Sequence, residues 1–166
     1  MIVISDTSPI SNLIELGYIH LLPELFQQVI IPSEVVEEPE ENQDPLFLKE
    51  LLAIQEAGWL QVRTPKSNTL PSSVQDIPLD SGETAAIALA LELGANVLLI
   101  DERAGYQVAQ NLQIQTLGLL GVLLQAKESG RIDTIKPLVD QLRDEIGFWI
   151  GQSLYERVIE LAGETD

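Results

Sequence analysis

The chain has 166 residues, of which 45% are hydrophobic, and this is enough to bury the core of one domain without disulfide or zinc support. It contains no cysteine, which excludes disulfides, cysteine-bound zinc, iron–sulfur clusters and thiol catalysis. A formal net charge of −17 disfavours general binding of polyanions such as nucleic acids. Because no apolar run reaches the roughly 18 residues of a membrane span, we expect a cytoplasmic protein without membrane association.

The first half of the chain alternates short apolar runs with segments typical of helices. The apolar runs predict strands at about 2–5, 28–31 and 59–62. The first helix is expected to follow Ser8 as its N-cap residue, with Pro9 at its first position. Further helices are expected at 21–26, after Pro32 and at 45–57. Residues 64–78, rich in proline and serine, indicate a surface loop.

The second half begins with a helix of small residues between Asp80 and Gly94 and continues the alternation. The other elements are expected to be strands at 97–100 and 113–117 and helices at 103–111, 119–128, 134–145 and 152–162. Strands and helices that alternate at these lengths form βαβ units with right-handed crossovers. We therefore predict one α/β domain over residues 1–166, a three-layer α/β/α sandwich with a mostly parallel sheet of about five strands.

Two acidic side chains directly follow predicted buried strands. Asp6 follows the first strand, and Asp101 follows the strand at 97–100. In open α/β sheets, ligands bind outside the carboxyl ends of the strands, and side chains at those ends point into that crevice. Carboxylates gathered there would form a site for a hard divalent cation. Each residue also has an ordinary structural interpretation, Asp6 as an N-cap and Asp101 as a turn residue.

Two further acidic positions have competing interpretations. Asp80 and Glu83 have the spacing of a capping box, in which Glu83 would bond to the amide of the cap residue. Glu37 and Glu38 lie in an acidic segment whose residues are most simply solvated. At about 100° per residue, Glu38 lies nearer than Glu37 to the helix face marked by the two preceding valines. Glu38 is therefore the preferred inward residue, with Glu37 in reserve.

The order of these acids resembles the PIN-domain family, especially its VapC-like branch of small prokaryotic ribonucleases. In that family a strand ends in Asp followed by small hydroxyl residues, and a second acid follows a strand–proline junction. A third acid opens a helix of small residues, and a fourth follows the next strand. The matching segments of this chain are 2–9, 29–38, 82–90 and 97–105. Segment 118–127 is similar to the closing helix of a PIN subgroup with extra C-terminal helices.

The resemblance implies a metal-dependent endoribonuclease that hydrolyses RNA phosphodiester bonds, as the toxin of a toxin–antitoxin pair does. It implies that acids at the carboxyl edge of the sheet hold Mg²⁺ or Mn²⁺. The catalytic and metal-binding acids are then Asp6, Glu38, Glu83 and Asp101. The supporting residues are Thr7, Ser8, Glu37 and Glu102. The single histidine, His20, lies among apolar neighbours and is interpreted as structural.

Two features depart from the family pattern. Many members carry Thr or Ser two residues before the fourth acid, where this chain has Leu99. The chain also has few cations with which to bind RNA phosphates, and each candidate is otherwise an ordinary surface or helix-end cation. The candidates are Arg103, Lys127 and Arg131. These features motivate an alternative function, a catalytically weak or inactive PIN-fold module that binds RNA or a protein partner.

Partners are expected at two places. Apolar residues of the C-terminal helices at about 134–162, among them Phe148, Trp149 and Leu154, either complete the core or form a homodimer interface. An antitoxin protein is a further implied partner, and a basic residue from it would fit among the acids. Receiver domains and aspartate-nucleophile phosphatases are disfavoured, because their paired acids with a late Lys, or their Asp-x-Asp motif, are not evident.

Overall fold

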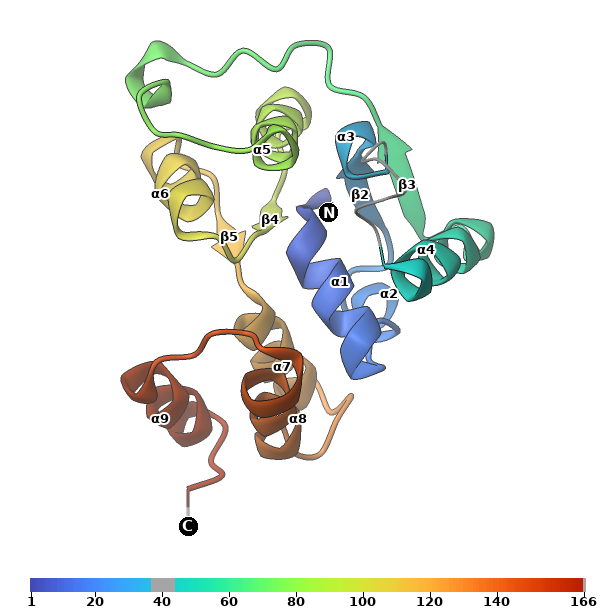
Figure 1. Cartoon of the computed structure of the whole chain (residues 1–166), viewed down its shortest axis with the longest axis vertical. Helices are drawn as coiled ribbons and strands as arrows, with labels where there is room; N and C mark the ends of the chain where they lie inside the picture. Colours follow the sequence, from blue (N-terminus) through green and yellow to red (C-terminus); the bar gives the residue numbers. More distant parts are fainter. Residues whose placement is uncertain (37–43, 166) are drawn as a thin grey trace.

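The computed structural model describes residues 1–36 and 44–165 and contains a five-stranded, all-parallel sheet in the order β3-β2-β1-β4-β5 (Figure 1). The strands are β1 (Val3–Ser5), β2 (Val29–Pro32), β3 (Leu60–Arg63), β4 (Val97–Leu99) and β5 (Thr116–Leu117). Helices cover both faces of this sheet. The predicted three-layer α/β/α architecture is confirmed.

Side chains of the central strands point alternately to two hydrophobic clusters, one on each face of the sheet. Val3 and Leu99 belong to the first cluster, and Ile4 and Leu98 belong to the second. β1 and β4 pair in parallel with Ser5 beside Leu99, so these two strands end side by side. The residues that follow them are therefore brought to the same edge.

Different helices cover the two faces. The second cluster is covered by α5 (Ser81–Leu93) and α6 (Arg103–Asn111), and the alanines of α5 allow this helix to lie close to the sheet. The first cluster is covered by α1 (Thr7–Leu16), α2 (Leu21–Phe26), α4 (Pro45–Ala57) and α7 (Leu119–Glu128). The short α3 (Ser33–Val36) follows β2 and contacts α5.

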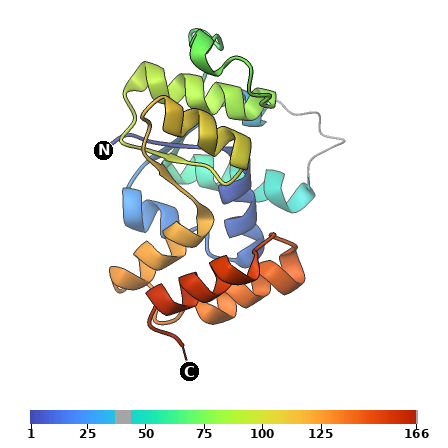
Figure 2. The same cartoon turned by 90° about the vertical axis from the view of Figure 1, so that its left-hand side faces the viewer.

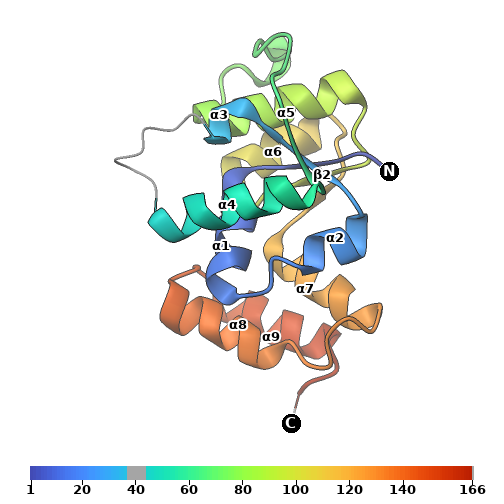
Figure 3. The same ribbon diagram turned by 90° about the vertical axis from the view of Figure 1, so that its right-hand side faces the viewer.

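The C-terminal helices lie together at one end of the molecule, away from α5 and α6 (Figures 2 and 3). They are α8 (Lys136–Gln141), a π-helical turn (Leu142–Ile146) and α9 (Gln152–Leu161). Leu138, Leu142 and Val158 are buried in the same hydrophobic cluster as α1 and α7. None of the helices in the described ranges is both long and apolar enough to cross a membrane.

Several element boundaries differ from the sequence expectation. The first helix begins at Thr7, and the amide of Asp6 donates to the carbonyl of Leu99 (2.9 Å), which keeps Asp6 extended at the N-cap position; Ser8 is thus not the cap. Pro32 belongs to β2, where it pairs with Arg63, so this strand runs one residue further than expected. The helix expected after Pro32 is α3, which begins at the next residue. The helix expected at 134–145 begins at Lys136 and changes to the π-helical turn after Gln141.

Candidate active site

Asp6 lies where β1 ends and α1 begins, next to the end of β4. Its side chain is only 5% exposed and makes no capping hydrogen bond to α1. Burial, together with the negative charges of Asp80, Glu102 and Asp101, raises its pKa from 3.8 to about 6. Asp6 thus occupies the N-cap position, as expected, without the side-chain hydrogen bond that a capping residue makes.

Asp101 lies two residues beyond the end of β4, and its two carboxylate oxygens have different surroundings. Oδ1 accepts a hydrogen bond from the amide of Leu119 (2.8 Å), the first residue of α7. Oδ2 is buried and has no hydrogen-bond partner among the described residues. Burial and the adjacent charge of Glu102 raise the pKa of Asp101 to about 6. One oxygen therefore fixes the orientation of the other.

Gly118, which precedes α7, makes this arrangement of Asp101 possible. A β-carbon on Gly118 would lie 2.8 Å from Asp101 Oδ1, which is closer than such atoms approach in proteins. The backbone of Gly118 is extended, with φ −87°, so any residue could adopt its conformation. Glycine is required here for space, and the space is occupied by the Asp101 carboxylate.

Glu83 reaches the same edge from the first turn of α5. The carboxylate of Asp80 caps this helix by accepting a hydrogen bond from the amide of Glu83 (2.7 Å). The Glu83 side chain is 7% exposed, and its Oε2 atom has no hydrogen-bond partner among the described residues. Burial and the neighbouring carboxylates of Asp80 and Asp6 raise its pKa to about 8. Asp80 thus forms its half of the capping box, while Glu83 lies among the acids.

Asp80 is an acid of this edge that sequence reasoning treated only as a cap. A β-carbon on Gly82 would lie 3.5 Å from Asp80 Oδ1, 3.6 Å from Asp6 Oδ1 and 3.9 Å from Thr7 Oγ1. The three side chains therefore surround an open space above Gly82. The signal that could have indicated Asp80 is its position three residues before Glu83, which places both on one side of the helix start.

The residue types at this edge fit a hard divalent cation, which prefers oxygen ligands and, in the case of Mg²⁺, keeps several waters. Two buried carboxylate oxygens without partners, on Glu83 and Asp101, and the space above Gly82 support this assignment. Within residues 1–36 and 44–165, no three Asp, Glu or His side chains are close enough together to hold one ion. The predicted second acid, Glu38, and its reserve, Glu37, lie outside the described residues.

The predicted supporting residues lie around these acids. Thr7 is the first residue of α1, and its hydroxyl faces Gly82. The hydroxyl of Ser8 is buried without a hydrogen-bond partner in the described part of the chain. Glu102 is exposed at the N-cap position of α6 and contributes negative charge to Asp6, Glu83 and Asp101. Leu99 is fully buried in the core and supplies no polar group.

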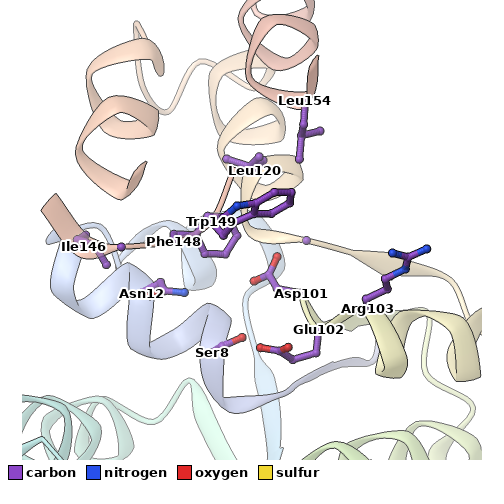
Figure 4. A pocket seen from close by; sticks show the side chains of 12 residues that line it. Ser8, Asn12, Asp101, Glu102, Arg103, Leu120, Ile146, Phe148, Trp149 and Leu154 are labelled. Carbon is purple, nitrogen blue, oxygen red and sulfur yellow. The ribbon is translucent and has the colours of Figure 1, made fainter. Parts of the chain in front are cut away.

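A cavity of about 740 Å³ opens beside Asp101 and extends to the C-terminal helices (Figure 4). Its polar wall contains Ser8, Asn12, Asp101, Glu102 and Arg103. Its apolar wall contains Leu120, Ile146, Phe148, Trp149 and Leu154. The aromatic part of this wall was not predicted as part of the site, because only tertiary packing brings these residues near Asp101.

Of the three cations predicted to meet RNA, only Arg103 lines the cavity. Lys127 instead binds the C-terminal segment: its ammonium group pairs with Glu164 (2.9 Å) and donates to the carbonyl of Ala162. Arg131 is exposed in the turn after α7. The charge of Lys127 is thus paired with a carboxylate of its own chain.

A comparison with protein families agrees with this geometry. The family model DUF3368, described as a PIN domain, matches residues 2–164. A search of curated proteins finds no match.

Proposed function

The chain belongs to the PIN-domain family, and on this basis we propose that it is a metal-dependent endoribonuclease that hydrolyses RNA phosphodiester bonds. We further propose that it is a VapC-like toxin of a cytoplasmic toxin–antitoxin pair. The observation that carries the proposal is the convergence of Asp6, Glu83 and Asp101 at one sheet edge, each with a raised pKa. Such perturbed groups, gathered in one place, are typical of functional sites.

In this proposal Asp6, Glu83 and Asp101 bind Mg²⁺ or Mn²⁺ partly through the water molecules that such ions keep, together with an acid from the segment that contains Glu37 and Glu38. When bound, the ion supplies Lewis acidity at the phosphate and lowers the pKa of water. Because a nearby cation favours the ionised form of a carboxyl group, it would lower the raised pKa values of the acids. The Leu119 amide, by binding Oδ1 of Asp101, holds this carboxylate in place for the ion.

The residues next to the acids have proposed roles in positioning. The buried hydroxyl of Ser8 is available to orient a water molecule, and that of Thr7 to orient the Asp6 carboxylate. Arg103, at the cavity edge, would bind a phosphate of the RNA strand. Leu99 cannot replace the hydroxyl found in many members of the family, so Ser8 is the residue that we assign to this task.

Two protein partners are also proposed. An antitoxin would present a basic side chain to the acids, where the uncompensated negative charge favours a cation. A second copy of the chain would complete a homodimer through apolar residues that stay exposed, such as Leu161, which is 56% exposed. Neither partner is needed for the chemistry assigned to the acids.

The test is cleavage of single-stranded RNA by the wild type, Asp6→Asn and Asp101→Asn in Mg²⁺, in Mn²⁺ and in EDTA. Asp133→Asn is the matched control, because Asp133 is exposed outside the site. We expect cleavage by the wild type and the control in either metal, and none in EDTA. Equal activity of all four proteins would reject the proposed mechanism.

The alternative, a PIN-fold module that binds without cleaving, is favoured by two observations. Leu99 is apolar and buried where many relatives carry a hydroxyl, and the net charge of −17 disfavours RNA. Calorimetric titration with Mn²⁺ separates the two functions. A nuclease must bind the ion and lose this binding in Asp101→Asn, whereas a binding module need not retain it.

A further inference from the structure

The cavity next to Asp101 has two chemically different walls that meet at the acids (Figure 4). Asp101, Glu102 and Ser8 form the polar side, and Phe148 and Trp149 face it from the loop before α9. A nucleotide also has two different parts, a charged phosphate and a flat aromatic base. The cavity thus offers a matching surface to each part.

Trp149 is unusual among the large apolar residues of the chain because its side chain is 84% exposed. It is nevertheless supported from one side: a β-carbon on Gly151 would lie 3.3 Å from the six-membered ring of the indole. Gly151 has φ −67°, which any residue adopts, so its lack of a side chain leaves room for the indole. Phe148 packs on the hydrophobic core and lines the same cavity.

We propose that Trp149, with Phe148 beside it, stacks on an unpaired base of the RNA strand whose phosphate lies at the acids. This inference rests on the proposed ribonuclease function and adds to it the residues that bind a base of the substrate. Stacking on aromatic side chains is a general way to bind unpaired bases without sequence preference. Bases within a duplex are already stacked on each other and do not offer a free face.

The surroundings of the two aromatic residues favour a base over a protein surface. The cavity is concave, and its volume of about 740 Å³ lies within the range of small-ligand sites. Arg103 supplies a cation and Asn12 an amide on the same lining, groups that suit phosphates and base edges. Binding energy from stacking also offsets the small number of cations, because it does not depend on charge.

The direct measurement uses Trp149 fluorescence in Trp59→Phe, which leaves Trp149 as the single tryptophan of the chain. The probes are a single-stranded phosphorothioate oligoribonucleotide, which is cleaved slowly, an abasic oligomer of equal length and a blunt duplex, all in Mg²⁺. We expect saturable quenching by the single strand alone. Quenching of equal size by the abasic oligomer would overturn the proposal.

Variants give an independent measurement. Trp149→Ala should weaken binding of the single strand roughly 5- to 150-fold and raise KM for cleavage with little change in kcat. Trp149→Phe should retain most of the affinity, and Gly151→Ala should lose part of it by displacing the indole. Leu52→Ala, which truncates an exposed apolar residue of α4 outside this cavity, is the control. Unchanged affinity and KM in Trp149→Ala would overturn the proposal.

The remaining outcomes separate the stacking site from the nuclease. If the single strand quenches Trp149 but no metal supports cleavage, stacking stands and the nuclease assignment fails. If RNA is cleaved but Trp149→Ala cleaves with the wild-type KM, the nuclease stands and stacking fails. If sedimentation shows a dimer that Trp149→Ala dissociates, the aromatic residues are a contact between two copies and the stacking proposal is overturned.

Discussion

The acids at the sheet edge and the acids of the C-terminal helices have opposite surroundings. In the C-terminal region, Asp140 accepts a hydrogen bond from Tyr155, which lowers its pKa, and pairs with Lys136 (2.9 Å). Glu164 is partly desolvated, yet hydrogen bonds from the amides of Ile135 and Lys136 and the ion pair with Lys127 lower its pKa. At the sheet edge, burial and repulsion between neighbouring carboxylates outweigh the amide hydrogen bonds, such as that from Leu119 to Asp101, and raise the pKa of each acid.

The difference shows two uses of the same chemical group. Asp140 and Glu164 hold the C-terminal helices together, because each ionised carboxylate is satisfied by donors of its own chain. The ionised acids at the sheet edge destabilise the folded chain, since their charges repel one another in a buried place. We infer that Asp140 and Glu164 contribute to stability and that the acids at the sheet edge contribute to function. Replacing one carboxylate of each group with an amide tests both statements.

The largest effect is expected for Glu83→Gln. Loss of one carboxylate from the proposed metal site should reduce RNA cleavage by roughly 10³-fold, corresponding to several kcal/mol of transition-state stabilisation. The melting temperature in EDTA should stay the same or rise, because a repelled charge is removed. Cleavage rates under single-turnover conditions and thermal melts provide the measurement. A large loss of stability with unchanged activity would contradict the comparison.

Glu164→Gln makes the same chemical change in the other region, and the expected result is reversed. The variant loses its ion pair with Lys127 and weakens the bonds from the Ile135 and Lys136 amides. We expect a loss of about 2 kcal/mol in the free energy of unfolding, seen as a melting temperature lower by roughly 4–8 °C. Cleavage well below the melting temperature should match the wild type.

Gly118→Ala should have a smaller effect that is confined to the sheet edge. The added methyl group would press on Asp101 Oδ1 and turn the carboxylate, so we expect cleavage to fall roughly tenfold, since small misplacements of catalytic groups are costly. Gly121→Ala in α7 is the matched control, because its β-carbon would meet only Leu117. A tenfold loss in both variants would point to a general disturbance of α7.

The smallest effect concerns pH. Asp6, Asp101 and Glu83 have pKa values of about 6, 6 and 8, above their ordinary values, so the metal-free folded chain binds more protons than the unfolded chain between about pH 4 and 8. Their contribution to stability is therefore greatest at low pH and is lost as pH rises. Asp140 and Glu164 have lowered pKa values and act in the opposite direction, losing their contribution in acid.

Melting temperatures measured in EDTA should therefore be highest near pH 5 and fall toward pH 8. In Asp6→Asn the decline should be smaller by about 1 kcal/mol of unfolding free energy, because one titrating group is removed. Added Mg²⁺ or Mn²⁺ should reverse the decline at pH 8, where the acids are ionised. A decline of equal size in Asp6→Asn would show that other groups cause it.

Much of the fold could be predicted because local signals agree with tertiary structure. α4, α6 and α7 begin and end at the predicted residues, where Pro45, Arg103 and Leu119 open apolar-periodic segments. The predicted boundaries differ from the structure where pairing between strands determines where an element begins or ends. The bond from the Asp6 amide to β4 sets the start of α1, and the pairing of Pro32 with β3 extends β2.

The site was predictable where it follows from strand ends and not where it depends on packing. The placement of Asp6 and Asp101 at one edge could be predicted because parallel strands end at a common edge. The role of Gly118 and the position of Trp149 had no sequence signal, since both depend on contacts between segments far apart in the chain. Glu164 was not considered either, because nothing local indicates that its side chain caps α8 from a distant turn.

The hydrogen bond from the Leu119 amide to Asp101 connects the first turn of α7 with the state of the acids. An amide proton bonded to a carboxylate changes its magnetic resonance frequency when that carboxylate gains a proton or a cation. The Leu119 signal in a nitrogen–proton spectrum should therefore follow both titrations at a single backbone position. The backbone amide of Leu119 thus reports the state of the Asp101 carboxylate, and no probe group has to be attached to the protein.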